Sequence, residues 1–214
     1  MPDKSARLPA ILSAAPVVPV LTITDRAVAV PLARALVAGG LTALEVTLRT
    51  PAGLDCIRAI AGEVEAANVG AGTVLDARQY EAAEKAGATF VVSPGVTNGL
   101  IAAAANSTVP FLPGVATASE AMALAERGYH YLKFFPAEPA GGIAYLRALG
   151  APLPEIHFCP TGGIGAKNAP DYLALANVIC VGGSWVAPAE AVAAGDWGRV
   201  TALARAAADL RKTA

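Results

Sequence analysis

The chain has 214 residues, 55% of them hydrophobic, with a mean hydropathy of +0.50; this composition supplies a sizeable core and excludes a disordered protein. The net charge is -1 and no basic stripe occurs, which excludes nucleic acid and anionic membranes as expected partners. The first ten residues lack the apolar core of a signal peptide and no uncharged apolar run reaches membrane-spanning length, so we expect a cytoplasmic protein without a membrane partner.

Short runs rich in Val, Ile and Phe alternate along the chain with Ala-rich stretches that carry scattered charges. The short runs are typical of buried strands, and the longer stretches are typical of helices. The strand-like runs are 17–23, 43–48, 68–72, 89–93, 110–114, 131–135, 156–161 and 177–182.

Helix-capping residues mark several of the intervening stretches. The stretch 76–87 begins at a capping Asp and ends on Gly, and Thr117-Ala-Ser-Glu120 has the form of a capping box. Pro31 lies inside the helix expected after Asp25, which predicts a late start or a kink there. The expected helices with recognisable ends are 5–14, 25–40, 76–87, 117–128 and 196–212.

Strands that alternate with helices pair in parallel, because each return crossover needs a helix. The two possible architectures are a closed barrel and an open doubly wound sheet. Eight near-equal units without a break in composition favour the barrel. We therefore predict one α/β domain over residues 1–214, a (β/α)8 TIM barrel with a short N-terminal helix. In such a barrel, reactive groups lie at the C-terminal ends of the strands.

One lysine, Lys133, lies among apolar residues in the run Tyr131-Leu-Lys-Phe-Phe-Pro136. Pro136 should end the strand, which places Lys133 near the mouth of the barrel. Partial desolvation there disfavours the charged ammonium, and a neutral amine can attack a carbonyl carbon. The pattern indicates a Schiff-base lysine. The alternatives are a lysine whose head group reaches water past apolar neighbours and a lysine on an edge strand, but a closed parallel barrel has no open edge.

A second polar pattern lies in Leu44-Glu-Val-Thr-Leu-Arg-Thr-Pro51. On a strand, Glu45, Thr47 and Arg49 share one face, which we expect to be the barrel interior, and the apolar residues between them face the helices. Charges inside a barrel are costly unless they are paired or used. The functional interpretation assigns proton transfer to Glu45 and a substrate carboxylate to the planar guanidinium of Arg49. The structural alternative is a buried ion pair that only closes the barrel.

Glycine-rich turns follow the last two strand-like runs, at 160–165 and 181–185. Barrels often bind phosphate in these two loops, where glycine lets backbone N–H groups approach the anion. The turns therefore indicate a phosphate site, with tight turns alone as the alternative. At the end of the third run, Gly70-Ala-Gly-Thr73 leaves room for a ligand, and Thr73 can donate a hydrogen bond.

The histidines and cysteines lack the spacing of metal ligands, so we expect no metal. His130 and His157 are predicted to be structural or surface residues. The odd number of cysteines favours a reducing compartment, with Cys56, Cys159 and Cys180 as small buried apolar residues.

The chain resembles the class I, Schiff-base-forming 2-keto-3-deoxy-6-phosphogluconate (KDPG) aldolases, a family also active on 4-hydroxy-2-oxoglutarate (KHG). The resemblance runs from Pro16 to Trp185, nearly the whole chain. The matching stretches are AGG at 38–40, LEVTLRT at 44–50, VGAGTV at 69–74, SPG at 93–95, KFFPAE at 133–138, FCPTGGI at 158–164 and GGSW at 182–185.

The resemblance implies that Lys133 forms the Schiff base and that Glu45 is the general acid and base. It also implies a homotrimer that takes a phosphorylated 2-keto acid and uses neither metal nor cofactor. The residues implied to hold the substrate are Arg49 and Thr73 at the pyruvyl carboxylate, Pro94 and Phe135 at the pocket wall, Thr161 near the hydroxyls, and Gly162, Gly163 and Ser184 at the phosphate.

The implied reaction cleaves KDPG to pyruvate and glyceraldehyde 3-phosphate, with KHG as a second substrate. The closest rival is an aldolase for the galacto epimer, but Thr161 favours the gluco substrate because relatives for the other epimer tend to carry an aliphatic residue there. A second alternative is a phosphate-binding barrel synthase or isomerase. That function would explain the two glycine turns, but it would not explain a lysine in an apolar strand. A non-catalytic sugar-phosphate binding protein has no need to desolvate both Lys133 and Glu45.

Overall fold

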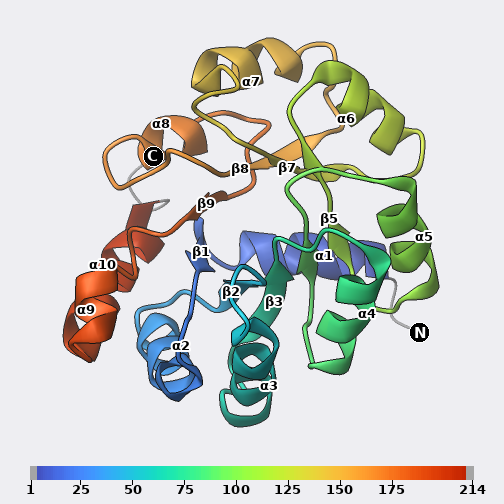
Figure 1. The fold of residues 1–214 in the computed structure, drawn as a ribbon. Coiled ribbons are helices and arrows are strands. Elements are labelled where there is room, and N and C mark those ends of the chain that lie inside the picture. Colours follow the sequence, from blue (N-terminus) through green and yellow to red (C-terminus); the bar gives the residue numbers. More distant parts are fainter. Residues whose placement is uncertain (1–3, 211–214) are drawn as a thin grey trace.

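The computed structural model describes residues 4–210 and shows strands surrounded by a ring of helices (Figure 1). The strands are β1 (Val17–Leu21), β2 (Ala43–Thr47), β3 (Asn68–Gly72), β4 (Val91–Val92), β5 (Phe111–Leu112), β6 (Gly114–Val115), β7 (Tyr131–Phe134), β8 (His157–Pro160) and β9 (Val181–Gly183). The helices are α1 (Lys4–Ser13), the 3-10 helix η1 (Arg26–Val28), α2 (Ala29–Ala38), α3 (Gly53–Glu63), α4 (Ala77–Lys85), α5 (Asn98–Asn106), α6 (Ala118–Ala125), α7 (Gly142–Gly150), α8 (Ala169–Leu173), α9 (Ala189–Ala193) and α10 (Trp197–Ala208).

The strands close into a parallel barrel. One sheet has the order β5-β4-β3-β2-β1-β9 and the other has the order β6-β7-β8. The short strands β5 and β6 are consecutive halves of one barrel strand that is interrupted at Pro113. On the other side, isolated bridges from Phe158 to Val178 and from Thr161 to Gly182 join β8 to the β9 segment. The eight predicted strand positions thus form the predicted (β/α)8 barrel.

Most strands are shorter than the apolar runs that predict them. The largest difference is at the last strand, predicted at 177–182 and found at Val181–Gly183. Residues 177–180 do meet β8, but only through an isolated bridge and single backbone bonds such as Phe158 N–H to the Asn177 carbonyl (2.7 Å). Apolar composition marks the path of the chain along the barrel, whereas the extent of a strand depends on regular pairing.

The caps that the sequence predicts are present. Asp76 accepts from the Gln79 N–H, and Thr117 and Glu120 form the capping box of α6. Asp25 caps η1, and α2 starts at Ala29, so the helix begins late, as Pro31 predicts, and Pro31 falls in its first turn. The N-terminal helix is also found, whereas residues 211–212 of the predicted last helix lie outside the described residues.

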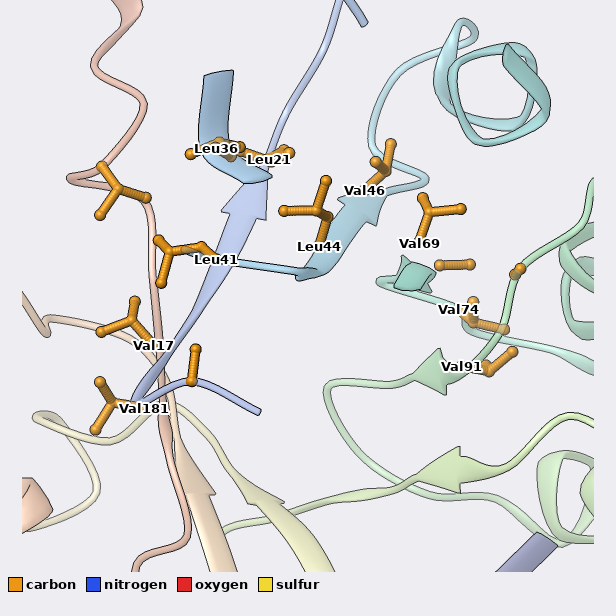
Figure 2. Close-up of a cluster of buried hydrophobic side chains, with 14 of the residues drawn as sticks. Val17, Leu21, Leu36, Leu41, Leu44, Val46, Val69, Val74, Val91 and Val181 are labelled. Atoms are coloured by element: carbon orange, nitrogen blue, oxygen red, sulfur yellow. The ribbon is translucent and has the colours of Figure 1, made fainter. Parts of the chain in front are cut away.

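Two apolar layers lie on the two sides of the barrel wall. The outer layer packs strands against helices, and Figure 2 shows part of it, where Leu36 of α2 lies near Leu21 of β1. The inner layer gathers Leu8, Ile11 and Leu12 of α1 with interior residues of the strands. Helix α1 therefore closes the N-terminal end of the barrel, which leaves the C-terminal end for the site. The strand-side members of the inner layer are Val18, Ala43, Phe90, Val92, Leu112, Cys159 and Cys180.

Cys56, Cys159 and Cys180 are buried, as predicted, and Cys56 lies in the outer layer. Within residues 4–210, no helix has both the length and the apolar character of a membrane span. Nor do three or more His, Cys, Asp or Glu side chains of the described residues gather where they could hold a metal ion.

Candidate active site

A lysine and a glutamate meet inside the barrel. Lys133 is the third residue of β7 and Glu45 is the third residue of β2, and each residue is only 3% exposed. The Lys133 Nζ donates to Glu45 Oε1 at 3.1 Å and lies 3.5 Å from Oε2. Because Nζ is buried, the alternative in which the lysine head group reaches water does not hold.

Strand alternation brings these two side chains together. Their neighbours on each strand, Leu44 and Val46 on β2 and Leu132 and Phe134 on β7, belong to the outer apolar layer. The intervening positions therefore face the interior, as predicted. Exchanging a buried ion pair for apolar residues is often neutral or stabilising, so stability alone is a weak reason for such a pair. A proton can pass between the two groups, which makes them suited to acid–base and nucleophilic chemistry.

Glycines on β3 make room for interior side chains. A Cβ at Gly72 would lie 2.2 Å from Glu45 Oε1 and 2.5 Å from Glu45 Cγ, so only glycine fits beside this carboxyl group. A Cβ at Gly70 would lie 2.5 Å from the Phe90 ring. The protein's own side chains therefore occupy the space beside Gly70 and Gly72, and room for a ligand at this strand end stays a prediction.

Arg49 and Thr73 lie together at the mouth of the barrel. The Arg49 Nε donates to Thr73 Oγ1 at 3.1 Å. Strand β2 ends at Thr47, so Arg49 lies in the following turn and is exposed rather than inside the barrel. Thr73 has a φ of 58°, a conformation that is costly for a β-branched residue and that clusters at functional sites.

The turn after β8 has a backbone that only glycine adopts readily. Gly162 and Gly163 have φ values of 104° and 80°. Asn168 fixes this turn, because its Oδ1 accepts from the Gly165 N–H at 2.8 Å and its Nδ2 donates to the Gly163 carbonyl at 3.1 Å. Thr161 is buried just before the turn. Sequence reasoning missed Asn168, whose only signal is its position after a glycine turn.

The turn after β9 lies beside the turn after β8. The Thr161–Gly182 bridge joins the two segments, and a Cβ at Gly182 would lie 2.2 Å from Thr161 Oγ1. Ser184 follows β9, is exposed, and lines a cavity of about 780 Å³ with Thr22 and Trp185. The two glycine turns therefore form one continuous edge at the C-terminal end of the barrel.

Pro94 and Phe135 also follow strands at this end. The Phe135 ring centroid lies 5.4 Å from Lys133 Nζ. The turn at Pro94 is fixed by Ser93, whose buried hydroxyl donates to the Gly95 carbonyl at 2.5 Å. The backbone of Pro94 lies so close to Gly114 that a Cβ there would be 2.3 Å from the Pro94 carbonyl carbon.

A second cavity, of about 570 Å³, lies at the N-terminal end of the strands, away from Lys133. Leu8, Phe111 and His130 are among the residues that line it. His130 Nδ1 is buried and has no hydrogen-bond partner within the described part of the chain, and the His157 ring stacks on Tyr131 with centroids 5.3 Å apart. Neither histidine belongs to the Lys133 site, in line with their predicted structural roles.

Comparison with known proteins gives one consistent family. A family model described as KDPG and KHG aldolase matches residues 8–203. The chain is 53% identical over 197 residues to the 2-dehydro-3-deoxy-phosphogluconate aldolase of Pseudoalteromonas atlantica, and the aligned residues cover 92% of each protein. It is 52% identical over 199 residues to the KHG/KDPG aldolase of Escherichia coli K12, and the aligned residues cover 93% of each protein.

A solved structure shares the fold. It is the KDPG aldolase of Legionella pneumophila with pyruvate captured as a covalent carbinolamine intermediate. That chain superposes with a TM-score of 0.91 and 45% identity, covering 94% of this chain and 97% of its own.

Proposed function

We propose that this chain, which belongs to the KDPG and KHG aldolase family, is a class I aldolase that cleaves KDPG to pyruvate and glyceraldehyde 3-phosphate. It also cleaves KHG to pyruvate and glyoxylate. The buried hydrogen bond between Lys133 Nζ and the Glu45 carboxylate carries this proposal, because it joins a nucleophile to a proton acceptor inside a barrel.

Catalysis begins at Lys133. Transfer of a proton from the Lys133 ammonium to Glu45 frees the amine, which attacks the C2 ketone of the substrate. Glu45 returns its proton to the carbinolamine hydroxyl, which leaves as water, and the resulting iminium withdraws electrons from C3. The iminium is the electron acceptor of the reaction, so the proposed mechanism uses no metal or cofactor.

Glu45 then serves the later proton transfers. Acting through a water molecule, it removes the proton of the C4 hydroxyl, and the C3–C4 bond breaks. The bonding electrons pass to the iminium and form an enamine, while the aldehyde product leaves. The enamine takes a proton at C3, and water then hydrolyses the iminium to release pyruvate and the Lys133 amine.

The remaining residues hold the substrate. Arg49 and Thr73 bind the carboxylate at the mouth, where an arginine fork matches carboxylate geometry. Pro94 and Phe135 form the pocket wall, and Thr161 meets the substrate hydroxyls, which favours the gluco over the galacto epimer. The proposed phosphate ligands are the turn residues Gly162, Gly163 and Ser184.

We place this enzyme in the cytoplasm as a homotrimer of one-domain chains, each spanning residues 1–214. The homotrimer rests on the family resemblance described above. Light scattering should therefore give a mass of three 21.5 kDa chains. A monomeric or dimeric mass would contradict the trimer without affecting the proposed reaction.

Borohydride reduction in the presence of pyruvate tests the proposal. We expect irreversible inactivation and a pyruvyl adduct on Lys133, located by peptide mass spectrometry, because borohydride reduces an iminium to a stable amine. Incubation with borohydride alone is the control. Failure to label Lys133 would overturn the proposed mechanism. In a separate assay of the untreated enzyme, faster cleavage of the galacto epimer than of the gluco epimer would contradict the assignment of Thr161.

Gly72 offers a test of how strictly Glu45 must be placed. A methyl group at position 72 overlaps the Glu45 carboxyl group, so Gly72→Ala should displace it and lower kcat on the order of 100-fold, as ångström-scale misplacement of a catalytic group does. Gly62→Ala on α3 is the matched control, because a Cβ there meets nothing within 4 Å. An unchanged kcat for Gly72→Ala would show that the position of Glu45 is not critical.

A further inference from the structure

The segment after β7 holds the glycine turn after β8. The Ala137 N–H donates to the Thr161 carbonyl at 2.8 Å, and the Glu138 N–H donates to the Gly162 carbonyl at 3.1 Å. These bonds continue the β7–β8 pairing past the ends of the strands. The backbone that follows Lys133 therefore supports the turn that we propose as part of the phosphate site.

The Glu138 side chain packs on the same turn. A Cβ at Gly163 would lie 2.6 Å from Glu138 Cγ, so this glycine and this side chain are in direct contact. The Glu138 carboxylate accepts a hydrogen bond from the hydroxyl of Tyr172 on α8. Gly142 completes the packing, since a Cβ there would lie 3.2 Å from the Tyr172 hydroxyl and 3.4 Å from Glu138 Oε1.

The Tyr172 hydroxyl is a buried hydrogen-bond donor to this carboxylate. The residue is fully buried, and burial, followed by the hydrogen bond to Glu138 and its charge, raises the pKa of Tyr172. The hydroxyl therefore stays protonated and remains a donor at working pH. A hydrogen bond to an ionised acceptor is also stronger than a neutral one.

The charge of Glu138 makes its position important. A carboxylate beside a phosphate-binding turn repels the phosphate when its oxygens are free to approach the anion. The hydrogen bond to Tyr172 fixes one carboxylate oxygen at α8. The turn that this side chain contacts is left-handed at Gly163, where φ is 80°.

We propose that Glu138, held by Tyr172, is a positioning residue that shapes the turn at Thr161–Gly163 for the substrate phosphate and so sets the preference for phosphorylated over unphosphorylated 4-hydroxy-2-keto acids. This inference rests on the proposed aldolase function. Because the contacts of Glu138 are with Tyr172 and the glycine turn, its proposed effect is on the binding of the phosphate end and not on bond cleavage.

The test compares two substrates in Tyr172→Phe and Glu138→Ala. For KDPG, KM should rise about tenfold while kcat stays within about twofold, because each variant loses the equivalent of one hydrogen bond to a charged group. For KHG, which has no phosphate, both constants should stay within about twofold of the wild-type values.

Two control variants separate positioning from a general structural effect. Glu138→Gln keeps the size of the side chain and an acceptor oxygen, so its KM for KDPG should return to within about threefold of wild type. Tyr80→Phe removes another buried tyrosine hydroxyl, which donates to the Val109 carbonyl at 2.7 Å, and should leave the ratio of the two KM values unchanged. Rescue by Glu138→Gln together with no effect of Tyr80→Phe supports positioning.

Equal effects on both substrates, or no change in their KM ratio, would overturn the inference while the aldolase function stands. The same holds if the wild-type enzyme shows no preference for KDPG. A wild-type protein that cleaves neither substrate would instead reject the proposed function, and this inference with it.

Discussion

Lys133→Ala should reduce KDPG cleavage to less than about 10⁻⁵ of the wild-type rate and abolish borohydride labelling by pyruvate. The proposed reaction passes through a covalent iminium, and Lys133 Nζ is the group placed to form it beside Glu45 and the Phe135 ring. Without the amine, the carbon–carbon bond has no electron acceptor. A coupled assay of pyruvate release measures the loss, and mass spectrometry measures the label.

The same substitution leaves Glu45 buried without its partner. Removing one member of a buried pair typically costs about 3–5 kcal/mol, so the free energy of unfolding should fall by several kcal/mol while the circular dichroism of the folded protein is kept. Lys85→Ala, at the exposed end of α4, is the control that removes a solvated lysine. Turnover above about 1% of wild type in Lys133→Ala would rule out the covalent mechanism.

The sequence predicted the interior positions of this barrel because alternation along a strand is local. Two residues on each side of Glu45 and Lys133 are enough to show which way their side chains face. The pair itself joins residues 88 positions apart, and only closure of the barrel brings β2 and β7 into reach across its interior. That residues from distant strands meet in one site was predicted from the general rule that reactive groups of a barrel gather at the C-terminal ends of its strands.

Other features depend on distances that no sequence pattern records. In the sequence, Gly72 indicates open space at a strand end, but in the structure the Glu45 side chain fills the space beside it. Arg49 continues the alternation of β2 in the sequence, but the strand ends at Thr47 and the guanidinium lies at the mouth. The contact of Glu138 with Tyr172 joins the turn after β7 to helix α8 across 34 residues of sequence, and it has no local signature.

Glu45→Gln should lower kcat for KDPG by about 10²- to 10⁴-fold, the range expected for loss of general acid–base catalysis. The amide keeps the shape of the carboxyl group and an oxygen that can accept from Lys133 Nζ, but it cannot take up the protons of the ammonium and of the C4 hydroxyl. KM should change much less than kcat, because the proposed carboxylate and phosphate contacts are left in place. Steady-state kinetics on KDPG measure both constants.

Trapping separates the role of Glu45 from that of Lys133. Because Lys133 is retained, Glu45→Gln should still form the reduced pyruvyl adduct, but at a lower rate than the wild-type enzyme. Glu65→Gln changes an exposed carboxylate and should alter neither measurement. If Glu45→Gln forms no adduct at all under prolonged trapping, Glu45 is required to free the amine. If it cleaves KDPG at the wild-type rate, another group carries the proton, and Glu45 takes no part in the reaction.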